Sequence, residues 1–269
     1  MDAETDPDLL LLACERGHRA VVECLLEDAQ LPLERPAAAA AKPMWSAMPL
    51  HVAARFGRDA VVRLLLEAHA KPGRADGLGI TALHCASERG HSDVVEMLLD
   101  AGASPDQARE NGTTPLYLAA RDGHGAAVKL LLARGADAEA CMLPVRDAAA
   151  GMTPLYAACS RGHTEVVTLL LEAGAAVDRA NTTGTTALHV ACHNGHAATA
   201  AALLHGRADA DLAGGARGAR PLLAAAERGH TACVELLVEA HADPTWRYRS
   251  GKTALETTLM VLVLSLIHI

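Results

Sequence analysis

A repeated segment constrains the fold of this chain more than any other feature. Its fullest form reads Thr-Pro-Leu-Tyr-Leu-Ala-Ala-Arg-Asp-Gly-His and occupies residues 114–124. Other copies of the closing pair, Gly-His or once Gly-Arg, end at His18, Arg58, His91, His163, His196 and His230. The steps between successive pairs are 40, 33, 33, 39, 33 and 34 residues. A period near 33 indicates one small supersecondary unit stacked many times, in place of a globular domain.

One copy shows why the repeat predicts a pair of helices. The Asn-Gly pair at residues 111–112 predicts a turn tip. Thr114 then predicts a helix N-cap, and Pro115 suits the first helical position because its missing N–H has no partner there. Apolar residues at i, i+3 and i+4 predict two short helices, which end at Gly123 and Gly135.

The recurring motifs resemble the ankyrin repeat. They read Leu-His-x-Ala-Ala, Gly-His, Val-Val-x-x-Leu-Leu and Gly-Ala-Asp, and the resemblance runs from Asp8 to about Leu255. It implies an all-α fold, an α-solenoid of stacked helix-turn-helix units with projecting β-turn tips and a concave groove. It also implies a protein-binding role. We therefore expect no enzyme activity and no cofactor.

The domain organisation follows from the period. We expect an ankyrin-repeat domain of about seven repeats over residues 1–255, with surface-loop insertions near 31–45 and 140–150. Residues 256–269 are expected to hold a broken last repeat and an artefactual tail. The last six residues match a translation of CTG TCT CTT ATA CAC ATC, which resembles a sequencing adapter. On this hypothesis the native protein continues past residue 255.

Charge and hydropathy narrow the class of partner. The net charge of −8 argues against nucleic acid, because phosphate binding needs a basic surface. The acidic N-terminus lacks a signal-peptide pattern, and the apolar segment 259–269 is shorter than the roughly 20 residues that span a bilayer. We expect an intracellular, cytoplasmic monomer with a protein partner and no membrane span.

The cysteines follow the repeat. Six of the seven lie in predicted helices and are expected to be small core residues in a reducing compartment. These six are Cys14, Cys24, Cys85, Cys159, Cys192 and Cys233. Cys141 lies in an insertion and is expected to be a thiol outside any disulfide.

Most of the fourteen histidines also fall on fixed repeat positions, where we expect hydrogen bonds between neighbouring loops. A cluster with metal-binding spacing consists of His189, Cys192, His193 and His196. The repeat accounts for every member except His193, so no metal site is expected. Metal-dependent activity at this cluster is the weakest alternative. No catalytic set stands apart from the repeat.

Two departures from the pattern predict local differences. His69, Arg207 and His241 replace the glycine that ends the second helix, so a left-handed backbone is expected there. Strain is expected at Arg207, with relief from the neighbouring Gly206. The copy that begins at residues 214–220 has lost its Thr cap, and its tip is expected to be the loosest.

The two residues before each glycine of the closing pair vary freely, and the resemblance implies that they face the groove and contact a target. We call twelve of them the recognition positions. They are Arg55, Phe56, Glu88, Arg89, Arg121, Asp122, Ser160, Arg161, His193, Asn194, Glu227 and Arg228. Phe56, the only phenylalanine, either anchors a partner or packs under the loop that contains Trp45.

Two functions remain open at this point. The first is a non-catalytic scaffold or adaptor that binds a protein through the groove and the turn tips. The alternative is a targeting module of a larger, truncated enzyme, ubiquitin-ligase adaptor or channel.

Overall fold

The chain is folded as pairs of short helices. A computed structural model describes residues 7–27, 33, 48–142, 151–215, 218–246, 253 and 256. This part contains fourteen helices and no strand, apart from one isolated bridge between Gly214 and Ala219. The helices form seven successive pairs, which confirms the predicted all-α repeat architecture. None of these helices is long and apolar enough to cross a membrane.

Each pair contributes a first and a second helix. The first helices are α1 (Pro7–Arg16), α3 (Pro49–Arg55), α5 (Ala82–Arg89), α7 (Pro115–Asp122), α9 (Pro154–Arg161), α11 (Ala187–His193) and α13 (Pro221–Arg228). The second helices are α2 (Arg19–Glu27), α4 (Asp59–Glu67), α6 (Ser92–Asp100), α8 (Gly125–Ala133), α10 (Thr164–Glu172), α12 (Ala197–His205) and α14 (Thr231–Glu239). Every second helix has nine residues, so the copies are nearly equal in length.

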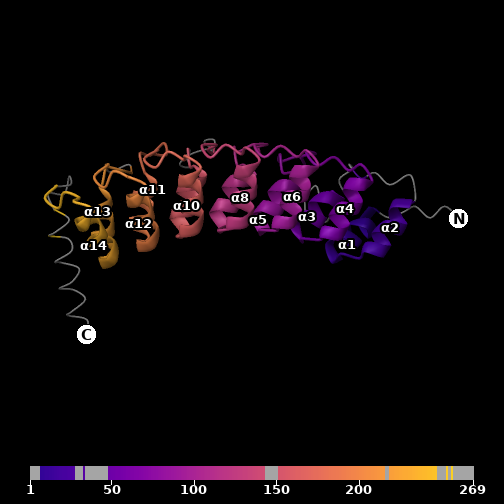
Figure 1. The fold of residues 1–269 in the computed structure, drawn as a ribbon, viewed down its shortest axis with the longest axis horizontal. Coiled ribbons are helices and arrows are strands. Elements are labelled where there is room, and N and C mark those ends of the chain that lie inside the picture. Colours follow the sequence, from indigo (N-terminus) through magenta and orange to yellow (C-terminus); the bar gives the residue numbers. More distant parts are fainter. Residues whose placement is uncertain are drawn as a thin grey trace, which may run out of the picture. The chain divides into compact units, whose positions relative to one another are not determined.

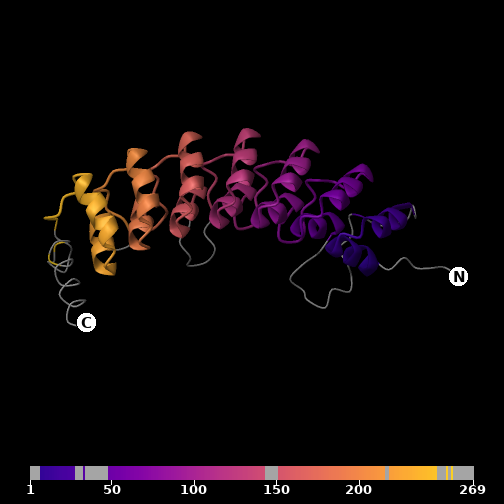
Figure 2. The same ribbon diagram turned by 60° about the horizontal axis from the view of Figure 1, so that its bottom comes forward.

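The pairs are grouped into two compact units. Unit 1 comprises Met1–Ala119 and His124–Asp137, and unit 2 comprises Ala120–Gly123 and Ala138–Ile269. Within unit 1, α3 lies between α1 and α5, and α2, α4, α6 and α8 form a second row. Within unit 2, α9, α11 and α13 form one row and α10, α12 and α14 the other (Figures 1 and 2). In both units, first helices pack on first helices and second helices on second helices.

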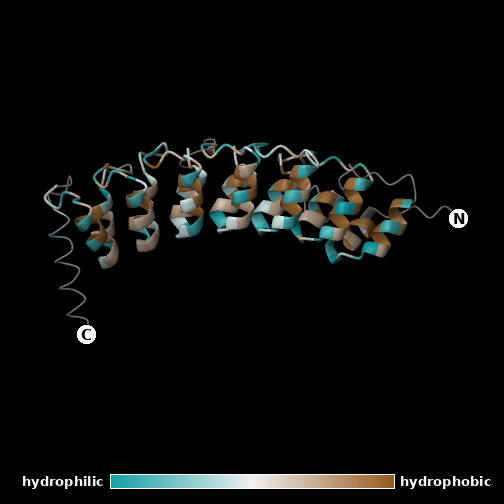
Figure 3. Ribbon diagram, in the orientation of Figure 1, coloured by the Kyte–Doolittle hydropathy of each residue, from teal (hydrophilic) through white to brown (hydrophobic). Residues whose placement is uncertain are grey.

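The core is built from alanine and branched aliphatic residues. Leu116, Ala119 and Ala120 are fully buried on one face of α7, as their spacing predicts. On α8, Val128 and Leu131 are fully buried as well. Hydrophobic residues lie mainly along the helices and hydrophilic residues at the turns (Figure 3). Small alanines on the first helices allow close helix packing, and leucines on the second helices fill the remaining space.

Threonine caps start several first helices, as predicted. The amide N–H of Tyr117 donates to Thr114 Oγ1 at 3.2 Å, and Tyr156 donates in the same way to Thr153. In the last copy, Glu256 N donates to Thr253 Oγ1 at 3.1 Å, while Thr253 N donates to Glu256 Oε2 at 2.9 Å. These two reciprocal bonds form a capping box, an arrangement typical of a helix N-terminus.

The left-handed positions are confirmed, but the predicted relief of strain is wrong. His69, Arg207 and His241 have φ of 65°, 67° and 63°. Gly206 has φ of −73°, so Arg207 adopts the left-handed backbone itself. The equivalent Gly102 has no atom within 4 Å of the place where a Cβ would lie. Open space around this position explains why larger residues fit, at the conformational cost of a positive φ.

One cysteine prediction is also wrong. Five of the six helical cysteines are buried, but Cys24 is exposed. The buried residue of α2 is Val22, and a residue two positions further along a helix points to a different face. None of the seven cysteines forms a disulfide, and Cys141 is half-buried with its Sγ 3.6 Å from Arg179 Nη2.

Some predictions concern residues outside the described part of the chain. These are most of the insertion near 31–45, which includes Trp45, residues 143–150 of the second insertion, and the proposed artefactual tail at the end of the chain.

Candidate functional site

The recognition positions all lie at the same place in the fold. Each occupies the last turn of a first helix or the residue that directly follows it. Arg55, Phe56, Glu88 and Arg89 belong to unit 1, and the other eight belong to unit 2. Within each unit, the side-by-side packing of first helices places successive pairs along one row.

Histidine side chains hold the backbone of this row. Five of the six Gly-His histidines donate from Nε2 to a carbonyl oxygen of the preceding repeat, and that carbonyl belongs to the first residue of a recognition pair. We call these bonds the histidine rungs. They join His91 to Arg55, His124 to Glu88, His163 to Arg121, His196 to Ser160 and His230 to His193, at 3.1–3.2 Å. The predicted hydrogen bonding between neighbouring loops is therefore confirmed.

Arginine replaces histidine in one copy without loss of the rung. Arg58 donates from Nε to the carbonyl oxygen of Glu15 at 2.9 Å. A guanidinium N–H is a donor of suitable reach, so the imidazole itself is not required.

The glycine before each histidine has two roles. Gly162 has φ of 76°, a backbone conformation that residues with a side chain rarely adopt. A Cβ at Gly162 would also lie 2.7 Å from His196 Nδ1. Gly195 is in the same situation against His230, at 2.6 Å. The glycine of these Gly-His motifs therefore packs against the histidine of the motif in the next repeat, so the motif also reflects packing between repeats.

The two members of a recognition pair differ in exposure. The first member is half-buried in all but the last pair, where Glu227 is exposed. The second member is exposed except at Asp122, whose side chain is only 18% exposed. The second members therefore offer most of the side-chain surface that a partner can reach.

In unit 2, the side chains of neighbouring recognition pairs contact one another. Arg121 Nη2 lies 2.7 Å from Asp122 Oδ2, and Arg161 Nη1 lies 2.9 Å from Asp122 Oδ1. Two guanidinium groups from successive first helices therefore share one carboxylate. Further along the row, Asn194 Nδ2 donates to the carbonyl oxygen of Ser160 at 2.8 Å.

The last contact of this row joins an arginine to a histidine. Arg228 donates from Nη2 to His193 Nε2 at 3.0 Å, so this nitrogen carries no proton. Partial burial and the charges of Arg228 and His230 lower the pKa of His193, while Glu227 opposes them. His193 is therefore held in its neutral form as a hydrogen-bond acceptor.

In unit 1, the exposed members make fewer contacts. The Phe56 side chain is 41% exposed, which leaves a large part of the ring accessible. Its other predicted environment, the loop with Trp45, lies outside the described residues. Arg89 is exposed and forms no hydrogen bond or ion pair with its side chain in the part of the chain that the structure describes.

Each member of the cluster with metal-binding spacing has a partner of its own. His196 forms a rung, His193 accepts from Arg228, and the Cys192 thiol contacts that of Cys233. Burial lowers the pKa of His189, which is hydrogen bonded to the backbone of Ala219. No three His, Cys, Asp or Glu side chains in the described ranges are placed to share a metal ion.

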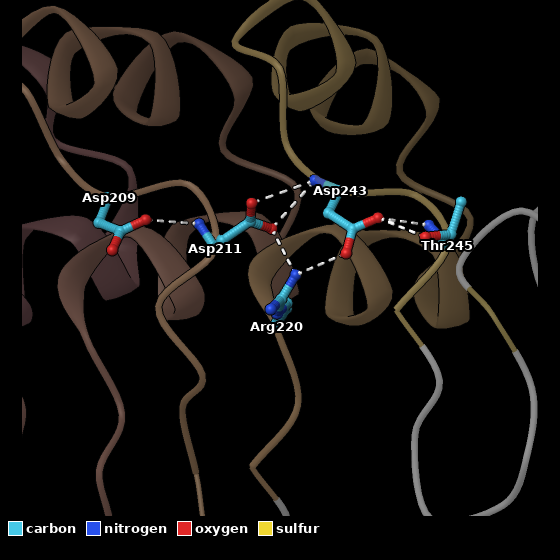
Figure 4. A network of polar contacts seen from close by, with 5 residues as sticks. All are labelled: Asp209, Asp211, Arg220, Asp243 and Thr245. Atoms are coloured by element: carbon cyan, nitrogen blue, oxygen red, sulfur yellow. Dashed lines mark hydrogen bonds and ion pairs between the residues drawn. The ribbon is translucent and has the colours of Figure 1, made fainter.

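The sequence did not predict a network of aspartates at the turns. Asp243 N donates to Asp211 Oδ1 at 3.1 Å, and Asp211 N donates to Asp209 Oδ1 at 2.9 Å (Figure 4). Arg220, which stands in place of the usual Thr cap, lies 3.0 Å from Asp211 and 3.2 Å from Asp243. Its guanidinium carbon is also 5.2 Å from the centre of the Trp246 ring. The signal in the sequence was the position of an arginine between two aspartates of successive repeats.

Comparisons with known proteins agree with this geometry. The sequence matches the family described as "Ankyrin repeats (3 copies)" over residues 50–142 and 142–213, and "Ankyrin repeat" over 217–248. Among solved structures, it resembles the crystal structure of the human ASB11 ankyrin repeat domain, with a TM-score of 0.71 and 30% sequence identity. That match covers 81% of this chain and 97% of the other. The comparison with curated proteins gave no match.

Proposed function

This chain belongs to the ankyrin repeat family, and on that premise we propose that it is a non-catalytic scaffold that binds a protein partner through its recognition positions and turn tips. Ankyrin repeats are generally protein–protein interaction modules. The same positions would serve as the binding site if the repeats target a larger enzyme, ubiquitin-ligase adaptor or channel.

The observation that carries this proposal is the combination of a fixed backbone with exposed side chains. The histidine rungs fix the main chain at the recognition pairs, while most second members remain exposed. A surface that is ordered before binding loses less conformational entropy when a partner docks. This arrangement favours binding of a protein partner over catalysis.

Two of the buried thiols support a non-catalytic role. Burial raises the pKa of Cys14 and of Cys85 to about 12. Both thiols therefore stay protonated near neutral pH, whereas a nucleophilic cysteine reacts as the thiolate.

Affinity capture with the whole chain tests the proposal. One variant combines Phe56→Ala with Arg89→Glu in unit 1, and a second combines Arg161→Glu with Arg228→Glu in unit 2. The control combines Val238→Ala with Arg63→Glu, two exposed positions on second helices. We expect at least one recognition variant to lose partners that the control retains. Equal capture by all three would exclude the recognition positions as the binding surface.

A further inference from the structure

Unit 2 carries arginines whose charge the fold leaves available. We propose that they select an acidic, extended segment of the protein partner, with carboxylates bound at Arg161 and at Arg228. This inference rests on the proposed function and adds the chemistry of the partner. We refer to Arg161 and Arg228 as the arginine pair.

Arg161 has donors left after its one internal contact. Its side chain is 55% exposed and donates a single hydrogen bond, from Nη1 to Asp122 Oδ1. Arg121 contacts both oxygens of the same carboxylate, at 3.0 Å and 2.7 Å. A guanidinium has five N–H donors, so most of those on Arg161 remain for a ligand. Because Asp122 is shared with Arg121, it does not engage Arg161 in a two-bond pair.

Arg228 is bound to a neutral group. Its one hydrogen bond goes to His193 Nε2, and it forms no ion pair within the described ranges. The adjacent Glu227 is exposed and acts electrostatically on His193. An arginine held by an uncharged imidazole keeps its full charge for an anion, and its planar fork suits a carboxylate.

Three other aspartates of unit 2 are engaged in its turns. Asp178, Asp209 and Asp211 accept backbone N–H groups in the turns of unit 2. These turns precede the first helices, whereas the arginine pair lies where those helices end. These three carboxylates therefore lie at the opposite end of the first helices from the arginine pair.

The row also suggests the spacing of the acidic residues. Arg161 is on α9 and Arg228 on α13, with α11 between them. Neighbouring packed helices are about 8–10 Å apart, which places the arginine pair roughly 20 Å apart. An extended peptide advances about 3.3 Å per residue, so carboxylates about six residues apart fit this pair. Between them, Asn194 uses Nδ2 internally and keeps Oδ1 for a peptide N–H.

The position of these arginines also has a purely local explanation, which the experiment must distinguish from ligand binding. Arginine in the last turn of a helix interacts favourably with the helix dipole and requires no ligand. The test therefore compares ligands that differ only in charge.

The experiment is an NMR titration of the whole chain that follows the Nε–Hε signals of its arginines. The probe is a blocked Gly/Ser peptide with two glutamates six residues apart, and the matched peptide carries glutamine at both places. We expect the glutamate peptide to shift the signals of Arg161 and Arg228 and the glutamine peptide to leave them unchanged. No response, or the same response to both peptides, would overturn the inference.

Variants then test the arginine pair itself. Arg161→Gln with Arg228→Gln should weaken binding by about tenfold for each arginine, as expected for a charge-assisted hydrogen bond. The matched control, Arg63→Gln with Lys129→Gln, removes the same charge from exposed second-helix positions. It should bind as the parent does, and equal weakening would reduce the effect to net charge and overturn the inference.

A charge-preserving variant controls for the possibility that the glutamine variants fail to fold. Arg161→Lys with Arg228→Lys should bind the glutamate peptide with intermediate affinity, because lysine keeps the charge but lacks the planar guanidinium. If the glutamine variants bound this peptide as tightly as the parent chain, the inference would also be overturned. If the glutamate peptide fails while capture still depends on the recognition positions, only the acidic partner is excluded. If capture is also independent of those positions, the proposed function fails too.

Discussion

Units 1 and 2 have the same backbone frame and different side-chain contacts on it. Histidine rungs fix the main chain at recognition pairs in both units. In unit 2, Asp122 and Arg161 link successive pairs, and so do His193 and Arg228. In unit 1, Phe56 and Arg89 are exposed without such bridges between their side chains and described neighbours. The repeat thus fixes where side chains are presented, and the residues of each copy decide what they can bind.

Among single substitutions, the largest loss of stability should come from adding a Cβ where a rung histidine packs against a glycine, and it should be similar in both units. In unit 2, Gly162→Ala should lower the free energy of unfolding by about 3 kcal/mol, since the new Cβ meets His196 and φ is positive. Gly174→Ala, with φ of 86° and no atom within 4 Å, should cost only about 1 kcal/mol. Urea unfolding measures both.

The corresponding test in unit 1 compares Gly57→Ala, against His91, with Gly102→Ala. A similar difference between these two variants would confirm that the frame is shared. Equal costs within either unit would show that contact with the histidine adds nothing to backbone strain.

The next effect is a pH dependence centred on unit 1. His84 is fully buried, and burial together with Arg109 lowers its pKa to about 3. Its Nε2 donates to Thr113 O at 3.1 Å, and Nδ1 accepts from Thr81 N. The folded state keeps this ring neutral, whereas the unfolded chain takes up a proton below about pH 6.5. Stability should therefore fall as pH decreases from 6.5 toward 3, by about 1.4 kcal/mol per pH unit.

Urea unfolding at several pH values between neutral and mildly acidic checks this dependence. His84→Gln should be less stable at neutral pH and should have a smaller pH slope. The equivalent residue of unit 2, His189, also has a lowered pKa, mainly through burial, so His189→Gln is the matched comparison. An unchanged slope in His84→Gln would contradict the assignment.

A smaller effect concerns Arg220 in unit 2. Arg220→Ala should lower the unfolding midpoint, because it removes contacts to Asp211, Asp243 and Trp246. Arg220→Thr should recover part of the loss, since threonine at this position can accept the N–H of Leu223, as Thr153 does for Tyr156. Such a cap contributes about 1 kcal/mol. Thermal unfolding compares the two, and an alanine variant as stable as the threonine variant would argue against a cap.

The smallest effect is confined to one side chain. Arg228→Gln should raise the pKa of His193 toward its ordinary value, because the guanidinium that disfavours the imidazolium is removed. The change in stability should be below about 1 kcal/mol, as for other exposed polar contacts. An NMR titration of the histidine signals measures the shift. A pKa that stays unchanged would mean that burial and His230 alone keep His193 neutral.

The sequence predicted features that depend on local pattern. Period, cap and spacing were sufficient to place the helix pairs and to expect hydrogen bonds from the Gly-His histidines. The sequence alone could not predict that these histidines bond to the backbone of the recognition pairs, because the acceptor depends on how neighbouring repeats pack. Cys24 was predicted to be buried but is exposed, because it lies two residues after Val22, the buried residue of α2, and so points to a different face of the helix.

Features specific to one copy were harder to predict. The sequence predicts only a lost cap at Arg220, whereas its side chain contacts Asp211, 9 residues before it, and Asp243, 23 residues after it. The contact of Arg161 with Asp122 likewise joins residues 39 positions apart. Such pairs depend on the side chains that two neighbouring copies happen to carry, so a repeat pattern alone does not specify them.

The histidine rungs also give the chain a polarity. Each rung is donated by the later of two repeats and accepted by the earlier one, as His196 shows for Ser160. A cut after α10 would remove the donor for Ser160, whereas a cut before α9 would leave that bond intact. Truncation from the C-terminal side should therefore remove the hydrogen bond that holds the recognition pair of the new last repeat, whereas truncation from the N-terminal side should leave the remaining pairs held. In such a chain, each repeat holds the binding residues of the repeat before it, and its own binding residues are held by the repeat after it.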